Sequence, residues 1–303
     1  RYTWLTVGLL LVALTLVFGV HPSGYRARLW LGFGGFYFQP SELLKVLLIA
    51  FLASYLSEKR ELLALAVYRL GPWRLPPLPY LAPMLITWGF SLFLLAWQGD
   101  LGTALLFFCA FLAMLYVASS RSVYVWAGLI LFVIGILAVY HLFAHVRPRI
   151  DIWLDPWSEP GGRSYQIVQS LLAFAAGGIL GQGLGYGQAA DYVPAVHTDL
   201  IFAALGEELG LVGALAVVTL YALLLHRGYR LALTTADDFQ KLLVTGLTAS
   251  LSLQAVVIMG GSLKLIPLTG VTLPFVSYGG SSLVMNLVVL GLLLHVSGRG
   301  QGE

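Results

Sequence analysis

The chain has 303 residues, of which 59% are hydrophobic and only 10% are charged, and its mean hydropathy is +0.86. Soluble domains carry about 25% charged residues, so this composition excludes an ordinary soluble enzyme. The net charge of +3 comes from basic residues spread over loops, which gives no basic patch for nucleic acid. A single cysteine, Cys109, excludes an internal disulfide and a cysteine metal site.

Eight apolar runs approach or reach the length of about 20 residues that a membrane-crossing helix needs. They are Trp4–Val20, Ser41–Tyr55, Tyr80–Trp97, Leu101–Val117, Val123–His145, Asp199–Leu225, Phe239–Gly260 and Leu273–Val296. These runs predict an all-α, polytopic membrane helix bundle forming a single membrane domain over residues 1–303. Lys and Arg are more frequent in the loops on the side of the N-terminus, which predicts that both chain ends are cytoplasmic.

Charged residues flank the start of the second run. Loop 21–39, predicted to lie outside, holds Arg28 among aromatic residues, which fits either an interfacial aromatic belt or a grip on a lipid phosphate. Glu42 and Lys45 follow, three residues apart on one face of a helix. This pair either neutralises itself within the bilayer or forms a charged wall of a polar cavity at the outer leaflet.

Two further polar features lie at outer helix ends. Asp100 sits in a tight turn directly before the fourth run, where it either caps the next helix or joins the cavity. His141 and His145 have the spacing of a zinc pair, yet no intervening Glu and no third ligand are near in sequence. The sequence therefore leaves the metal site unknown.

The connection 146–198 is predicted to be a long extracytoplasmic loop within the membrane domain, and loops of this length are usually functional or disordered. Its stretch Tyr165–Ala176 has the spacing of a short amphipathic helix. Six glycines follow in Gly177–Gly187; without a Lys they do not form a phosphate loop, and we interpret them as flexible hinge backbone. Asp191 lies close behind them.

The segment YVPAVHTDLIFAALGEELGLVG, which starts at Tyr192, carries acids into an apolar run. Asp199 either occupies the first turn of a helix capped by Thr198 or serves chemistry. Glu207 lies deeper, where a charge costs about 2.5–3.5 kcal/mol on insertion scales and therefore needs a function. Near the C-terminus, TLPFVSYGGSS contains Ser277 in a stretch whose Pro and Gly residues break helix regularity, which favours a buried or cavity-lining position.

The predicted topology gathers charged and polar residues at the outer ends of the helices, whereas the inner halves carry few. This distribution predicts a polar cavity that opens to the outer leaflet and accepts a lipid-linked substrate with an anionic head group; an ion channel would need a lined path on both sides. The residues concerned are Arg28, Glu42, Lys45, Asp100, Asp199, Lys264 and Ser277.

Motifs along nearly the whole chain carry a specific resemblance. GFYFQPSELLK, QGDLGT, DPW, YQIVQSLLAF, GQGLG, HTDLIFAALGEELGLVG and LPFVSYGGSS appear in this order. Together they resemble the SEDS family of RodA, FtsW and SpoVE. That family has about ten membrane helices, so two more are expected before the first run seen here. The RGY at Arg227–Tyr229 leans toward the RodA branch.

The resemblance implies an inverting peptidoglycan glycosyltransferase of the bacterial inner membrane, which polymerises lipid II for the cell wall and cell shape. It also implies a class B penicillin-binding protein as partner and a divalent cation, Mg or Mn, as possible cofactor. The family's essential aspartate falls on Asp199, the expected catalytic base, and its earlier acidic position on Asp191. Ala195 departs from the family's usual Glu. The expected substrate-binding residues are Arg28, Glu42, Lys45, Asp100, Asp191, His197, Glu207 and Ser277.

Two other functions are compatible with the same features. A lipid II flippase would also use intramembrane charges and broken helices. A non-catalytic scaffold for a penicillin-binding protein would need Asp199 only as a cap. The scarcity of charge in the inner halves argues against the flippase, because a head group would need a polar route across the membrane.

Overall fold

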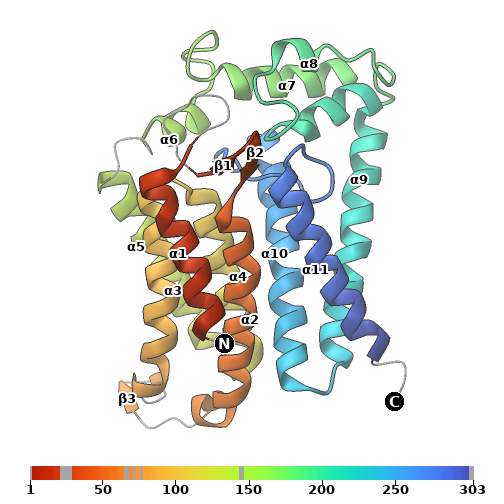
Figure 1. Cartoon of the computed structure of the whole chain (residues 1–303). Coiled ribbons are helices and arrows are strands. Elements are labelled where there is room, and N and C mark those ends of the chain that lie inside the picture. Colours follow the sequence, from red (N-terminus) through yellow and green to blue (C-terminus); the bar gives the residue numbers. More distant parts are fainter. Residues whose placement is uncertain are drawn as a thin grey trace. The chain divides into compact units, whose positions relative to one another are not determined.

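The computed structural model of the chain describes residues 2–20, 29–64, 68–70, 73–75, 78–142 and 147–299. Its long helices overlap the eight predicted runs and confirm the all-α membrane bundle, and Figure 1 shows their order along the chain. They are α1 (Tyr2–Phe18), α2 (Pro40–Ala64), α3 (Leu78–Gln98), α4 (Leu101–Ser119), α5 (Ser122–Leu142), α9 (Ile201–Thr234), α10 (Asp238–Ser262) and α11 (Gly280–Arg299).

Short elements connect these helices. Strands β1 (Leu31–Phe33) and β2 (Phe36–Phe38) form an antiparallel hairpin, as do β3 (Tyr68–Leu70) and β4 (Trp73–Leu75). The long connection contains α6 (Arg147–Leu154), α7 (Tyr165–Gly177) and α8 (Ala189–Tyr192). Helix α7 confirms the predicted amphipathic helix at Tyr165–Ala176, and its buried side includes Ile167 and Ala173.

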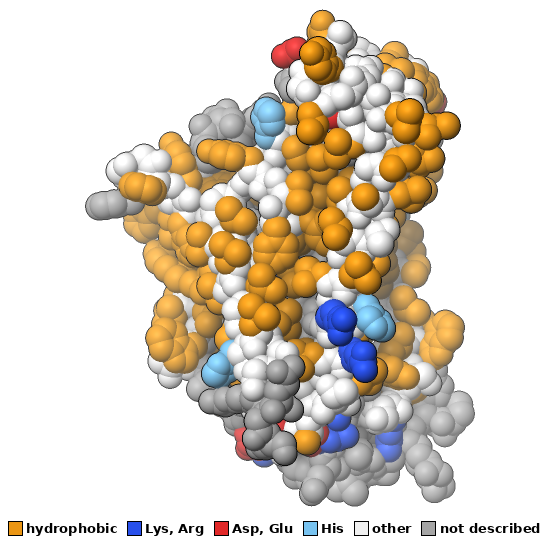
Figure 2. All heavy atoms as spheres, turned by 90° about the vertical axis from the view of Figure 1, so that its right-hand side faces the viewer, with side chains coloured by type: hydrophobic (Ala, Val, Ile, Leu, Met, Phe, Trp, Pro, Cys, Tyr) orange, Lys and Arg blue, Asp and Glu red, His pale blue; other side chains and the backbone are white. Residues whose placement is uncertain are grey.

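Within the described ranges, α2, α4, α9, α10 and α11 are long and apolar enough to cross a membrane, whereas α1, α3 and α5 contain shorter apolar stretches. The apolar span of α2 is 72% buried inside the protein, but that of α9 is only 11% buried, so α9 exposes most of its apolar surface. Figure 2 shows one face of the molecule, on which hydrophobic side chains predominate and charged ones are few. This surface suits contact with lipid tails or with another membrane helix.

Contacts between residues divide the chain into two compact units, each assembled from separated stretches. Unit 1 comprises Arg1–Gly128, Arg227–Leu251 and Gly280–Glu303, and unit 2 comprises Leu129–His226 and Ser252–Gly279. Helices α5, α9 and α10 contribute residues to both units. The assignment of one membrane domain to residues 1–303 stays a prediction.

Unit 1 is organised around α2. Leu44, Leu48, Leu52 and Leu56, spaced four apart along one face of the helix, are at most 2% exposed. The sequence predicted that α2 ends at Tyr55, before the charges of residues 58–60, but the helix runs on to Ala64. It does so with Arg60 in an ion pair with Asp238 at the start of α10, which gives that charge a partner.

Unit 2 contains two small hydrophobic clusters. One joins Phe202 and Tyr221 of α9 to Ile258 of α10, and the other joins Leu200 to Ala173 of α7 and Ala189 of α8. The last long helix begins at Gly280 and not at the predicted Leu273, because residues 273–279 form turns with Phe275 at a positive φ of 67°.

The glycine-rich stretch of unit 2 packs closely at Gly177, Gly181 and Gly187, so its interpretation as a flexible hinge does not hold for these three positions. Its backbone lies against α9: Gln182 N–H donates to the Glu207 carbonyl (3.0 Å), and Leu211 N–H donates to the Gly178 carbonyl (2.9 Å). A Cβ at Gly181, whose φ is +80°, would lie 2.2 Å from the Glu208 carbonyl oxygen. Glycine is needed here for close backbone approach, and α9 itself is kinked at Gly210.

Candidate functional site

Asp199 ends a compact turn directly before α9. Ala195 at the start of the turn has φ of 56°, and its carbonyl accepts hydrogen bonds from the N–H groups of Thr198 (3.2 Å) and Asp199 (3.0 Å). The Thr198 hydroxyl also donates to this carbonyl (3.1 Å), while α9 begins only at Ile201. The alternative in which Thr198 caps the helix is therefore wrong, and the turn holds the Asp199 side chain half-buried instead.

The loop between α10 and α11 is hydrogen-bonded to this turn. The buried Ser277 hydroxyl donates to the Thr198 carbonyl at 2.5 Å and accepts from Leu273 N–H at 2.8 Å. Tyr278 N–H donates to the His197 carbonyl at 2.8 Å. Two neighbouring carbonyls of the HTD turn are thus bonded to two neighbouring residues of this loop.

The surroundings of Asp199 suit a proton acceptor. Burial raises the pKa of the Asp199 carboxyl above its usual value, and the Thr198 hydrogen bond and the positive charge of Arg149 only partly oppose this rise. The backbone of Gly270 passes close by, since a Cβ there would lie 3.6 Å from Asp199 Oδ2. A carboxylate with a raised pKa accepts a proton more readily, which suits a general base.

Arg149 is a basic residue that the sequence analysis did not single out, and its positive charge lowers the pKa of the Asp199 carboxyl. It is exposed on α6, and it lies four residues before Trp153, on the same side of that helix. The Trp153 indole N–H donates to the Lys264 carbonyl (3.0 Å), and Lys264 Nζ donates to the Leu154 carbonyl (3.4 Å). Lys264 thus links α6 to the loop that follows α10.

The other acids and the histidine of unit 2 differ in what they contact. Glu207 is 4% exposed, and its Oε2 accepts a hydrogen bond from Ala189 N–H at 2.7 Å. This carboxylate fixes the start of α8, which explains its burial without a substrate. Asp191 and His197 are both exposed, and their roles in substrate binding stay predictions.

A second polar cluster lies in unit 1. Lys45 Nζ and Glu42 Oε2 form an ion pair at 2.7 Å with side chains only 3% and 10% exposed. The Ser41 hydroxyl donates to Asp100 Oδ2 (3.3 Å), and Asp100 Oδ1 caps α4 by accepting from Thr103 N–H (3.1 Å). Burial raises the pKa of Asp100, and the negative charge of Glu42 adds to that rise. The structure thus pairs Glu42 with Lys45, and Asp100 caps α4 and accepts a hydrogen bond from Ser41 of α2. The roles of these three residues in substrate binding stay predictions.

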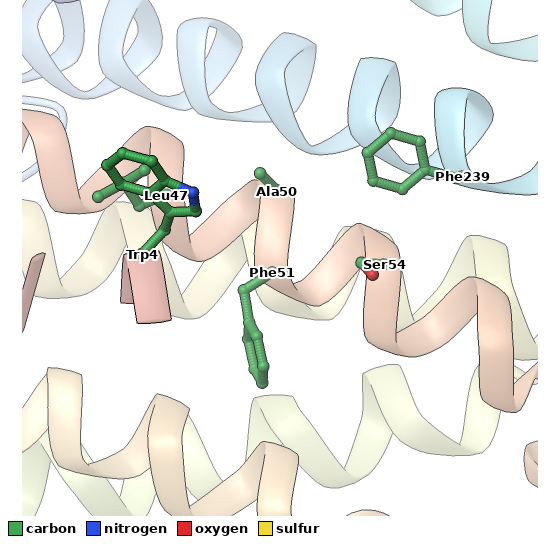
Figure 3. Close-up of a pocket in the computed structure, with 6 residues that line it drawn as sticks. All are labelled: Trp4, Leu47, Ala50, Phe51, Ser54 and Phe239. Atoms are coloured by element: carbon green, nitrogen blue, oxygen red, sulfur yellow. The ribbon is translucent and has the colours of Figure 1, made fainter. Parts of the chain in front are cut away.

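The predicted common cavity stays a prediction, because Glu42, Lys45 and Asp100 belong to unit 1 whereas Asp199 and Ser277 belong to unit 2. Arg28 lies outside the described residues. Unit 1 also has an open pocket, shown in Figure 3, which offers no ionisable group for chemistry. Its lining residues are Trp4, Leu47, Ala50, Phe51, Ser54 and Phe239.

The part of the chain that the structure describes contains no cluster of three or more His, Cys, Asp or Glu side chains that could hold a metal ion. Glu42 and Asp100 come near each other, but Lys45 already neutralises Glu42. These residues do not form a metal site by themselves, so the predicted divalent cation has no protein cage among them.

Comparisons with known proteins give consistent matches. The family model for cell cycle proteins of the FtsW, RodA and SpoVE type matches residues 2–301. The peptidoglycan glycosyltransferase RodA of Mycobacterium tuberculosis is 47% identical over 271 residues, which cover 89% of this chain and 58% of that protein. The probable peptidoglycan glycosyltransferase FtsW of Geobacter metallireducens is 39% identical over 298 residues, 97% of this chain and 76% of that protein.

The fold matches a solved structure as well. A chain from a peptidoglycan synthase complex, whose structure concerns the coordination of polymerization and crosslinking, aligns with a TM-score of 0.76 at 31% identity. The alignment covers 98% of this chain and 81% of that chain. The chain described here spans about three fifths of the length of the mycobacterial RodA relatives that it matches.

Proposed function

The chain belongs to the cell cycle protein family of FtsW, RodA and SpoVE, and on this premise we propose that it is a peptidoglycan glycosyltransferase that polymerises lipid II. The observation that carries the proposal is the half-buried Asp199, held in a fixed turn with a raised pKa and with the charge of Arg149 acting on it. The higher identity to RodA than to FtsW supports a role in cell shape through the RodA branch.

Asp199 is the general base of this reaction. A hydroxyl group of the acceptor sugar attacks the anomeric carbon of the donor, and its proton passes to the Asp199 carboxylate. The new glycosidic bond forms as the bond to the lipid diphosphate breaks, and the diphosphate leaves with both bonding electrons. One displacement inverts the configuration and needs no covalent intermediate. General-base assistance of this kind contributes about 10²–10⁴-fold to the rate.

Arg149 stabilises the charge that develops on the diphosphate. Its guanidinium is exposed on α6, and its positive charge lowers the pKa of Asp199, which supports placing base and cation at one site. Arginine binds phosphate oxygens in a bidentate manner, and such fixed charges act most strongly where negative charge develops in the transition state. A divalent cation, Mg or Mn, would enter together with the diphosphate, since Mg²⁺ is usually held by substrate phosphates and few protein ligands.

The proposal includes the setting of the reaction. The enzyme lies in the bacterial plasma membrane with both ends cytoplasmic, which the excess of Lys and Arg in the inner loops supports. It works at the outer leaflet with a class B penicillin-binding protein that crosslinks the strands; the synthase complex that it resembles supports this partnership. Labelling a cysteine placed at the exposed Glu159 with an impermeant thiol reagent checks the orientation, and protection in intact cells would reverse it.

The variant Asp199→Asn tests the function. The full-length protein with its transpeptidase partner is given labelled lipid II and a divalent cation, and glycan length is read on a gel. Asparagine keeps the shape of the side chain but accepts no proton at neutral pH, so polymer should fall at least about a hundredfold while the protein stays folded. Asp151→Asn, an exposed aspartate of the same unit, is the matched control.

The outcomes of this experiment separate the three candidate functions. If Asp199→Asn makes a near-normal amount of polymer, Asp199 is excluded as the general base and the turn that carries it has only a structural role. An unmutated complex that makes no polymer but moves lipid II across vesicles supports the flippase. A complex that does neither, and yet activates the penicillin-binding protein, supports the scaffold.

A further inference from the structure

We propose that Ser277 is a positioning residue for Asp199, acting through the main chain of Thr198, and that it is not a substrate contact. The proposal rests on the proposed function, in which Asp199 is the base. The sequence placed Ser277 among the expected substrate-binding residues because it belongs to the polar residues gathered at the outer ends of the helices. Its hydrogen bonds give it a different role.

The hydroxyl of Ser277 is already occupied inside the protein. A serine hydroxyl has one proton to donate, and here that proton goes to the Thr198 carbonyl oxygen at 2.5 Å. The same oxygen accepts a hydrogen bond from Leu273 N–H at 2.8 Å. With the residue only 8% exposed, the side chain has no proton and little surface left for a sugar.

The loop that carries Ser277 is itself anchored to helix interiors. Gln254 of α10 is fully buried, and its Nε2 donates to the Thr272 carbonyl at 2.9 Å and to the Thr272 hydroxyl at 3.3 Å. The Tyr221 hydroxyl of α9 donates to the Pro274 carbonyl. Irregular backbone beside membrane helices needs such hydrogen-bond partners. The loop is therefore a fixed support for the turn that it contacts.

The support acts on the residue next to the base. The Asp199 N–H is held by the Ala195 carbonyl, which fixes one side of the peptide that joins Thr198 to Asp199. The Thr198 carbonyl belongs to the same peptide and is held by Ser277. Both ends of this planar unit are thus bonded, which sets the direction in which the Asp199 side chain leaves the backbone. Catalytic groups must keep their geometry within about 0.5 Å, and a displacement of about 1 Å can cost a hundredfold in rate.

The variant Ser277→Ala removes this bond and adds no bulk. Initial rates of lipid II polymerisation by the full-length complex, normalised to folded protein, should show kcat lowered about tenfold to a hundredfold with KM unchanged. The acidic limb of the pH profile of kcat should move to lower pH, because water reaching the released carboxylate returns its pKa toward the usual value. Ser277→Thr, which retains a hydroxyl, should recover kcat, and Ser277→Cys should lie between.

The matched control is Ser262→Ala, a buried serine of the same unit whose hydroxyl bonds only the Ile258 carbonyl of its own helix. It should leave kcat, KM and the pH profile unchanged. A raised KM with normal kcat in Ser277→Ala would show that Ser277 binds substrate and would overturn the proposal. An unmoved acidic limb, or activity that falls only with the amount of folded protein, would overturn it too. If Asp199→Asn retains polymerisation activity, the proposed function is wrong. If Asp199→Asn is inactive but Ser277→Ala has normal kcat, the proposed function stands and the inference about Ser277 is wrong.

Discussion

The ion pair between Glu42 and Lys45 gives the sharpest test of the energetics in unit 1. The two charges are 2.7 Å apart, and their side chains are 10% and 3% exposed. Substituting Lys45→Met leaves the Glu42 carboxylate buried without its cation. Breaking a buried pair in this way costs about 3–5 kcal/mol, because the remaining charge loses its partner but stays desolvated.

This cost can be read as a loss of thermal stability. For chains of roughly 150–250 residues, 1 kcal/mol corresponds to a shift of about 2–4 °C in Tm, so Lys45→Met should lower Tm by about 6–20 °C. The double variant Glu42→Gln, Lys45→Met removes both charges and should recover most of that loss. Tryptophan fluorescence of the purified protein during heating measures both shifts.

A matched control exists on the same helix. Lys59 pairs with Glu58 at 3.3 Å, but these side chains are 29% and 48% exposed, and pairs of this kind contribute about 0–1 kcal/mol. Lys59→Met should therefore change Tm very little. If Lys45→Met is as mild as Lys59→Met, or if the double variant is no more stable than the single one, the reasoning is refuted. Lipid II polymerisation by a stable double variant then decides whether Glu42 and Lys45 belong to the reaction site.

Three further predictions concern unit 2. Gly181→Ala should prevent normal folding, because its Cβ would lie 2.2 Å from the Glu208 carbonyl oxygen and φ is +80°. The control Gly135→Ala on α5, whose Cβ would have nothing within 4 Å, should fold normally. Thermal unfolding compares the two variants, and equal Tm values would contradict the close packing at Gly181. In the proposed reaction Asp199 must be ionised to act as the base, so polymerisation should be lost as pH falls through its raised pKa. Arg149→Gln removes a charge that lowers this pKa, so the acidic limb of the pH–rate profile should move to higher pH, and KM for lipid II should rise. An unmoved limb would exclude Arg149 from the site; Arg163→Gln, in an exposed pair with Glu159, is the control.

The glycine-rich stretch after α7 was located from the sequence, but the structural role of its glycines was misjudged. The glycines after α7 were expected to form a flexible hinge, but Gly181 is required because the backbone there lies against α9. Glycine composition alone does not separate these cases, because freedom of φ and absence of Cβ are properties of the same residue. Only the position of the neighbouring helix shows which property is used.

The sequence by itself determined the membrane helices, the amphipathic α7 and the position of Asp199. Apolar runs of sufficient length have few stable alternatives in a bilayer, and the HTD motif places the aspartate without any knowledge of contacts. These features depend on residues that are neighbours in the chain or one helical turn apart. These features can therefore be predicted from the sequence alone.

The tertiary structure decided which partner each polar group has. Ser277 and Thr198 are 79 positions apart in the chain, and Arg60 and Asp238 are 178 positions apart. Arg149 likewise acts on Asp199 across a long segment of sequence. Hydrogen bonds and charges act over a few ångströms in space, so a partner that is distant in the chain becomes predictable only when the folded backbone brings the two together.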